Sequence, residues 1–428
     1  MERRQRGTNI GPGFALAGPA GFAAGSLRRA GMAIFDFTTM SAAQAASLVT
    51  ISGGANARYF DASGNFVAAG GALRLDTDPI TLQRRGLLIE RQQRVCVSLD
   101  NRDFTTANWT RRGTISITAD AGQARPDGTT GAMKIVGLAG AGSADFYDAN
   151  YAVASRFPAS KRIEPAFFVN RISTTGILTV TSALGTASGR WDVNLASLSA
   201  GWNYITRSHP SVTIANEFVA NASGQNGFNV VCNTGAPISL YLDFLTLETD
   251  GTNDTLIAGL PIVVNTANGV TRTAEAAFMS SIARFIGPAG TLFIDAIIPP
   301  QIGAINYGVM AALNAAGNYT GGSGFLVRQI AASIEFGGYA ASSSIGAPSS
   351  YQPVQVVATW GGANMSGKAT GLSVVSSALN DFTAAATDRL ELGALSAWNT
   401  QAHPQIWVRK IGLAKTAYSA AQMARLAP

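Results

Sequence analysis

The segment Thr114-Ile115-Ser116-Ile117-Thr118 alternates strictly between polar and apolar side chains. Successive side chains of a β-strand point to opposite faces, so this pattern predicts a strand with one buried face and one solvent-facing face. Segments of similar character follow at residues 164–169, 176–181, 202–206, 228–231 and 238–244. Turn residues separate them, and no helical pattern intervenes. The spacing predicts an antiparallel β-sandwich over residues 95–250.

A second set of strand-like segments follows a polar stretch that begins at Glu248. These segments are residues 291–298, 324–327, 333–336, 355–360, 389–392 and 406–411. We therefore expect a crossing linker over 251–275 and a second sandwich over 276–428, which ends in a short helix over 418–426. The predicted fold class is all-β, with two consecutive antiparallel β-sandwich (jelly-roll) domains after a Gly/Ala-rich N-terminal anchor region.

The N-terminal part of the chain has a different character. Residues 1–35 are rich in Gly, Ala and Pro and show no regular period, which predicts a flexible or partner-ordered arm. Five arginines and one glutamate lie within the first thirty residues, so the arm is either a solvated tail or a contact for an acidic partner. In the next region, 36–94, Ser41 and Gln44 have the spacing of a capping box and predict a short helix.

Composition excludes several classes of protein. Only 13% of the 428 residues are charged, about half the globular average of about 25%, and the net charge is +6. Because that charge is concentrated at the front, the rest of the chain does not resemble a nucleic-acid groove. No apolar run reaches the roughly 18 residues that span a bilayer, and Gly11 and Pro12 interrupt the only candidate signal segment. We predict no membrane insertion. The two cysteines, Cys96 and Cys232, are expected to be buried thiols.

Catalytic and metal-binding motifs are sparse. His209 and His403 are the only histidines, and each is followed by proline. The sequence therefore offers few residues for a histidine triad or a zinc site. Two alternatives stay open: oxygen ligands for calcium over 250–254, and a hydrolytic pair among the strand carboxylates. These carboxylates are Glu164, Glu217, Asp243, Asp295 and Glu335. The chain is predicted not to be an enzyme and to need no metal or cofactor.

Aromatic residues in polar loops are the candidates for sugar contacts, because an exposed ring can cover the apolar face of a sugar. Trp202 and Trp360 lie in alternating strand patterns and are expected in the core. Trp398 and Asn399 lie in a polar loop between strands, and Tyr147 and Tyr151 occupy a comparable position. We predict that Tyr147, Tyr151, Trp398 and Asn399 contact a carbohydrate.

Three motifs occur in a fixed order along the first half of the chain. Asp78-Pro79-Ile80-Thr81 leads to Gly86-Leu87-Leu88-Ile89-Glu90, then Phe104-Thr105-Thr106-Ala107-Asn108-Trp109-Thr110 follows, and Pro126-Asp127-Gly128-Thr129-Thr130 completes the series. This order resembles a module common in tailed-phage and prophage virion proteins. The chain departs from that family at residues 91–94, and at 242–247, where the family carries Trp-Gly-Ala-Gln, so no ligand is carried over from that strand.

The resemblance extends to the C-terminal part and covers about residues 55–428. The segments 356–360, 390–393 and 411–422 resemble a concanavalin-A-like, laminin-G-type sandwich, and the first sandwich resembles a carbohydrate-binding module.

The resemblance implies a virion spike or tail-fibre subunit that mediates adsorption by binding host-surface polysaccharide. It also implies attachment to other virion proteins through residues 1–94 and a homo-oligomer, with a trimer as the first expectation. Such a protein is located in the virion and assembled in the bacterial cytoplasm. Two rival functions remain: a purely structural head-decoration or tail component, and a capsule polysaccharide depolymerase.

Overall fold

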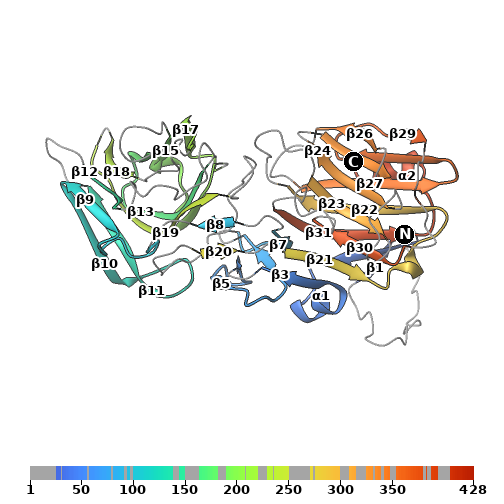
Figure 1. The fold of residues 1–428 in the computed structure, drawn as a ribbon, viewed down its shortest axis with the longest axis horizontal. Coiled ribbons are helices and arrows are strands. Elements are labelled where there is room, and N and C mark those ends of the chain that lie inside the picture. The colour runs from blue at the N-terminus through green and yellow to red at the C-terminus, as the bar shows by residue number, and fades with distance from the viewer. Residues whose placement is uncertain are drawn as a thin grey trace, which may run out of the picture.

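Strands make up most of the chain, and every pairing among the described residues is antiparallel, which confirms the predicted all-β fold class. The computed structural model describes residues 26–29, 31–54, 57–78, 81–90, 94–96, 100–137, 144–149, 163–181, 189–207, 209–219, 229–234, 236–249, 270–272, 275–298, 308–314, 324–330, 333–338, 342–347, 353–378, 382, 387–393 and 405–428. The strands form two sandwiches that lie side by side (Figure 1).

The middle sandwich is built from two sheets, which we name sheet D and sheet E. Sheet D contains β8 (Arg94–Cys96), β10 (Ile115–Ala124), β11 (Thr130–Gly137), β13 (Glu164–Arg171), β16 (Trp202–Ile205), β19 (Ser239–Thr249) and β20 (Val270–Arg272). Sheet E contains β9 (Trp109–Gly113), β12 (Ala144–Asp148), β14 (Ile177–Thr181), β15 (Arg190–Asn194), β17 (Val212–Asn216) and β18 (Asn229–Thr234). In β14, Leu178 and Val180 enter the core between the sheets while Thr179 points outward, as the alternation in the sequence predicts.

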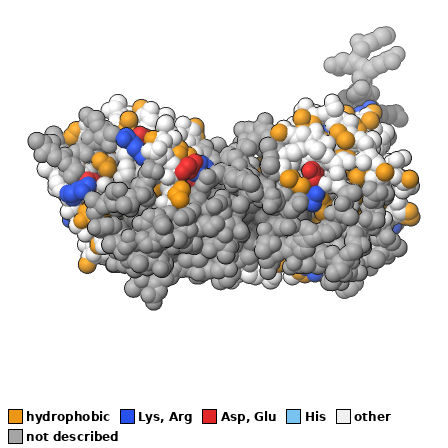
Figure 2. Space-filling view, turned by 45° about the horizontal axis from the view of Figure 1, so that its top comes forward, with side chains coloured by type: hydrophobic (Ala, Val, Ile, Leu, Met, Phe, Trp, Pro, Cys, Tyr) orange, Lys and Arg blue, Asp and Glu red, His pale blue; other side chains and the backbone are white. Residues whose placement is uncertain are grey.

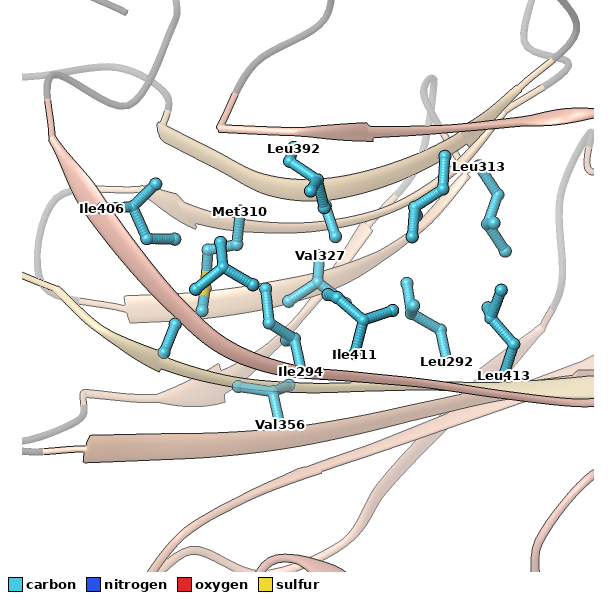
Figure 3. Close-up of a cluster of buried hydrophobic side chains, with 14 of the residues drawn as sticks. Leu292, Ile294, Met310, Leu313, Val327, Val356, Leu392, Ile406, Ile411 and Leu413 are labelled. Carbon is cyan, nitrogen blue, oxygen red and sulfur yellow. The ribbon is translucent and has the colours of Figure 1, made fainter. Parts of the chain in front are cut away.

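The second body, which we name the terminal sandwich, consists of sheets A and B. Sheet A contains β1 (Ser26–Arg29), β2 (Met32–Asp36), β6 (Leu75–Thr77), β7 (Arg84–Ile89), β22 (Gly290–Ile297), β27 (Pro353–Gly361), β28 (Asn364–Ala369), β29 (Val375–Ala378) and β31 (Ile406–Ala414). Sheet B contains β3 (Thr50–Gly53), β21 (Glu275–Ser280), β23 (Gly308–Asn314), β24 (Phe325–Ile330), β25 (Ser333–Gly338), β26 (Ser342–Gly346) and β30 (Arg389–Leu392). Aliphatic side chains from both sheets meet between them (Figure 3).

The outer face of sheet A is also covered. Helix α2 (Ala420–Leu426) lies within the predicted range, and its N-cap Ser419 forms a capping box with Gln422. Its Met423 packs with Phe293 of β22 in a small hydrophobic cluster. Because β22 is covered on both faces, its sequence is almost continuously apolar rather than alternating. Trp360 is buried in the core on the inner face of sheet A, as predicted.

The N-terminal strands lie within the terminal sandwich, which differs from the predicted division of the chain. β2 pairs with β31, so Asp36 lies opposite Lys410, and β3 pairs with β21 of sheet B. Helix α1 (Ala42–Leu48) follows the predicted capping box at Ser41, between these strands. Residues 26–29 and 32–36 therefore form strands instead of the end of a flexible arm. The blue strands accordingly lie among the orange and red strands in Figure 1.

A small hairpin joins the two sandwiches. β4 (Arg58–Phe60) and β5 (Phe66–Ala68) place Phe60 and Phe66 against Phe168 and Phe244 of the middle sandwich. Leu88 and Trp407 of the terminal sandwich belong to the same cluster, which we name the junction cluster. The junction cluster is thus a hydrophobic core that both sandwiches share.

Candidate functional site

One of the four predicted carbohydrate contacts lies among the described residues. Tyr147 is on β12 of sheet E and is half-buried. It lies in a strand rather than in the loop that the sequence suggested. Tyr151, Trp398 and Asn399 lie outside the described residues, as does the calcium alternative at 250–254.

Tyr147 points from the outer face of sheet E, because its neighbour Phe146 enters the core of the middle sandwich. The register places Asn229 of β18 directly beside Tyr147, and Thr181 of β14 follows Asn229. Thr110 of β9 lies on the other side of Tyr147. One row across four strands therefore presents a phenol ring, an amide and two hydroxyls.

A second row lies next to the first. Arg112 of β9 holds Asp145 of β12 with its Nε and Nη2 atoms, at 2.9–3.2 Å. Thr179 donates a hydrogen bond of 2.7 Å to Asp192 Oδ1, and Arg190 pairs with the same carboxylate. Together the two rows form what we name the sheet E face: Thr110, Arg112, Tyr147, Asp145, Asn229, Thr179, Thr181, Arg190 and Asp192. Cationic and anionic side chains lie next to one another on the middle-sandwich lobe in Figure 2.

Two features of the sheet E face suit it to a polar ligand. The Arg112 guanidinium lies 5.8 Å from the Tyr147 ring centroid, and its side chain is 47% exposed, so its donors are reachable from solvent. The Oδ1 atom of Asn229 is buried and has no hydrogen-bond partner. A buried acceptor without a donor costs about 1–3 kcal/mol, so a ligand hydroxyl that reached it would recover that energy.

The strand carboxylates occupy different positions. Glu164 and Glu217 are brought together because both bind the guanidinium of Arg207. Burial opposes the charge of Arg207, but the two carboxylates outweigh it and raise its pKa. Each of the other three carboxylates has its own cation: Asp243 pairs with Arg102 and Arg125, Glu335 with Arg328, and Asp295 with Arg409. Because Arg207 binds both Glu164 and Glu217, its guanidinium occupies the space between these two carboxylates.

Asp295 on β22 is the least well paired of these groups. Its Oδ1 is buried without a hydrogen bond and lies 3.5 Å from Arg409 Nη1. Burial raises the pKa of Asp295, although Arg409 opposes the shift. The folded protein thus keeps this proton to a higher pH than the unfolded chain, so this group lowers stability as the pH rises above the unfolded value of 3.8.

We predict that Asp295→Asn removes this loss of stability. In urea denaturation across a pH series, the variant is expected to gain stability relative to the wild type as the pH rises from about 4 to about 7, and to show no such gain below about pH 3. Glu335→Gln is the control, since Glu335 accepts hydrogen bonds from Arg328 and Ser342 at 2.5–3.0 Å and lies on the other sheet. Parallel curves for Asp295→Asn and the wild type would contradict the prediction.

Several motif residues that carry the sequence resemblance lie at or near the junction, whereas Phe104 and Trp109 pack in the core of the middle sandwich and Thr110 lies on the sheet E face. Glu90 binds Arg74, which is fully buried, and Leu88 lies in the junction cluster. Gly86 has φ +124°, and a Cβ there would lie 2.4 Å from the Val408 carbonyl oxygen, so only glycine fits. The Pro126 carbonyl accepts a hydrogen bond of 2.9 Å from Phe66 N.

The strand that departs from the family pattern also contributes to the junction cluster. In residues 242–247, Phe244 adopts φ +50° at a bulge and enters the junction cluster, while Arg102 lies 4.1 Å from its ring centroid. Trp202, expected in a sandwich core, is instead half-buried beside this cluster and donates to the Ala124 carbonyl oxygen at 2.9 Å. The alternating pattern of its strand does not specify which face is the core.

Three further predictions concern metal binding, membrane spanning and the cysteines. Within the described ranges, no three His, Cys, Asp or Glu side chains gather in a way that would hold a metal ion, and no helix is long and apolar enough to cross a membrane. Cys232 is a buried free thiol, as predicted, and burial raises its pKa to about 12. Such a thiol is unreactive at neutral pH. Cys96 lies in β8, and its side chain is outside the described set.

Several solved structures are similar to this chain at low sequence identity. No protein-family model and no curated protein sequence matches the chain. Among solved structures, the chain is similar to the CBM40 module of a Ruminococcus gnavus sialidase bound to α2,3-sialyllactose (12% identity, 34% of this chain and 84% of that chain, TM-score 0.27). It is also similar to a tandem CBM22 domain of Paenibacillus barcinonensis Xyn10C (10%, 75% and 98%, TM-score 0.23). A third neighbour is a carbohydrate esterase of the Shiga toxin-encoding bacteriophage phi24B (11%, 33% and 82%, TM-score 0.22).

Proposed function

We propose that this protein is a spike or fibre subunit of a phage or phage-like particle, and that it binds host-surface polysaccharide through the sheet E face. The observation that carries the glycan-binding part is the row of Tyr147, Asn229 and Thr181, which combines an aromatic ring with an unpaired amide oxygen and a hydroxyl. The ordered motifs of the sequence support the virion part. Neither depends on a catalytic centre.

The chemistry of the sheet E face suits a saccharide. A sugar ring offers an apolar C–H face to an aromatic side chain and hydroxyls to neighbouring polar groups. Asn229 Oδ1 would accept a hydrogen bond from a sugar hydroxyl, and Arg112 offers donors from an exposed position. The two guanidinium groups on this face are balanced by Asp145 and Asp192, so the face favours no strongly charged ligand.

A fibre does not need a strong single site. Several identical subunits on one particle raise the effective concentration of each weak site, so the combined attachment is much tighter than one contact. From the sequence resemblance, the proposal also includes a homotrimer and attachment to other virion proteins through residues 1–94.

The test replaces Tyr147 and measures binding to purified bacterial capsular and O-antigen polysaccharides. Tyr147→Ala is expected to weaken binding by about tenfold or more, equivalent to about 1.4 kcal/mol. The matched control is Tyr241→Ala, which removes a half-buried tyrosine from β19 on the opposite sheet, where its hydroxyl binds Asp120. The control is expected to bind like the wild type.

The rival functions give different results in the same assay. A purely structural component would bind none of the polysaccharides at high protein concentration. A depolymerase would release oligosaccharides, and the release would stop on substitution of Glu164 or Glu217. Equal losses in Tyr147→Ala and Tyr241→Ala would contradict the assignment of binding to the sheet E face.

A further inference from the structure

Three charged side chains lie in one row across the outer face of sheet A. Lys410 of β31 is directly opposite Asp36 of β2 on one side and directly opposite Asp295 of β22 on the other. The adjacent residues Ile411 and Ile294 enter the core of the terminal sandwich, so alternation turns the charged side chains outward. Both aspartates are nevertheless buried, and Lys410 is partly exposed. The lysine amine thus lies between two buried carboxyl groups.

The two oxygens of Asp36 have different surroundings. Its Oδ2 atom lies 3.1 Å from the Nζ atom of Lys410. Its Oδ1 atom accepts hydrogen bonds from the backbone N–H of Thr38 at 3.0 Å and from the Thr38 hydroxyl at 2.5 Å. Two donors on one oxygen stabilise the negative charge that develops there when a nucleophile adds to the carboxyl carbon. The amine of Lys410 is such a nucleophile, and it lies beside the oxygen that carries no such donors from Thr38.

Asp295 provides a proton acceptor on the other side of Lys410. Its Oδ1 atom is buried without a hydrogen bond and lies 3.5 Å from Arg409 Nη1. Burial raises the pKa of Asp295, while the cations of Arg409 and Lys410 oppose the shift and the charge of Asp36 adds to it. A carboxylate with a raised pKa is a stronger base, so Asp295 is suited to take a proton from an amine.

We propose that Lys410 and Asp36 form an intramolecular isopeptide bond, with Asp295 as the group that transfers a proton. The Lys410 ammonium first gives one proton to Asp36 Oδ2, which leaves a neutral amine and a carboxylic acid. The amine nitrogen then attacks Asp36 Cγ, and Asp295 carries a second proton from that nitrogen to Oδ2. The Cγ–Oδ2 bond breaks, and Oδ2 leaves as water. One amide and one water replace one ammonium and one carboxylate, so atoms and charge balance without a co-reactant.

The bond would join strands from the two ends of the chain, and it does not depend on glycan binding. β2 belongs to residues 1–94, which we propose attach the protein to the particle, and β31 lies near the C-terminus. A covalent link would hold β2 on sheet A when force acts on that attachment. Because an amide is uncharged, the link affects stability equally at every pH and leaves in place the pH-dependent gain expected for Asp295→Asn.

Intact-mass spectrometry of the full chain, after overnight incubation at neutral pH, tests the bond. The wild type is expected to weigh one water molecule less than its sequence, and trypsin to release one branched peptide that joins residues 30–58 to residues 410–415. Lys410→Arg keeps the positive charge but has no amine, so it should have the full sequence mass. Lys134→Arg is the matched control, since Lys134 is a half-buried lysine of β11 in the middle sandwich, and it should lose water like the wild type.

Two results would overturn the proposal. The first is a wild-type mass equal to the sequence mass. The second is a loss of water without the branched peptide, because an Asp-Gly succinimide, as at Asp127-Gly128, also releases water.

The role of Asp295 is tested by a time course after cell-free synthesis. Asp295→Asn is expected to slow the appearance of the branched peptide by about tenfold or more, because an amide cannot accept the proton. Asp295→Glu keeps a carboxylate and is expected to form the bond faster than Asp295→Asn. Equal rates in Asp295→Asn and the wild type would overturn the assignment of proton transfer to Asp295.

Discussion

Replacing Arg74 by methionine is expected to lower the free energy of unfolding by about 3–5 kcal/mol, the cost of removing one partner from a buried ion pair. Arg74 is fully buried and binds both Glu90 and Glu275, and its Nη1 also donates to the Arg58 carbonyl oxygen at 2.9 Å. Burial opposes the charge of Arg74, but the two carboxylates outweigh this effect and raise its pKa. Without the guanidinium, both buried carboxylates would lose the cation that they share.

Chemical denaturation of purified protein measures the loss of stability. Two further variants serve as comparisons for it. Arg74→Met combined with Glu90→Gln and Glu275→Gln is expected to regain part of the lost stability, because the uncompensated charges are gone. Arg190→Met breaks an exposed pair with Asp192 and is expected to cost less than about 1 kcal/mol. If Arg74→Met were no more costly than Arg190→Met, the central role of Arg74 would be refuted.

Replacing Phe66 by alanine is the second large effect, at about 3–5 kcal/mol. Phe66 is fully buried, and its ring centroid lies 5.1 Å from Phe60, 5.5 Å from Phe168 and 5.2 Å from Phe244. Because the junction cluster draws from both sandwiches, its loss removes packing that couples them. We expect the unfolding transitions of the two sandwiches to separate in differential scanning calorimetry.

Phe218→Ala is the matched control for this separation. Phe218 is buried against Trp191 inside the middle sandwich, at a ring-centroid distance of 6.1 Å, and does not belong to the junction cluster. The loss of Phe218 is expected to destabilise the middle sandwich without separating the unfolding transitions of the two sandwiches. A single transition in Phe66→Ala, displaced no further than in Phe218→Ala, would show that the hairpin does not couple the sandwiches.

Local sequence patterns were sufficient for the strands whose alternation reflects one buried face. The pattern at residues 114–118 corresponds to β10, and the capping boxes at Ser41 and Ser419 start both helices. The N-terminal strands could not be assigned in this way. Residues 32–36 are a short apolar run whose stability comes from pairing with β31, far along the chain, and periodicity carries no information about distant partners.

The candidate site shows the same limit. Tyr147 is visible in the sequence because aromatic residues in polar surroundings are conspicuous. Arg112, Asp145 and Asn229 are not, since their relation to Tyr147 depends on the register of three strands.

The arrangement of sheet A has a consequence for how the protein is made. Trp407 Nε1 donates a hydrogen bond of 2.7 Å to Asp76 Oδ2, and these residues are 331 positions apart in sequence. During synthesis the ribosome releases residues 26–89 long before it makes β31. The edges of these strands that pair with β31 therefore stay unpaired while the middle sandwich folds as an inserted unit. Unpaired edges invite association with other chains, so newly made polypeptide is most vulnerable to aggregation in this interval. Folding of the terminal sandwich is thus a late event, because it depends on the synthesis of β31.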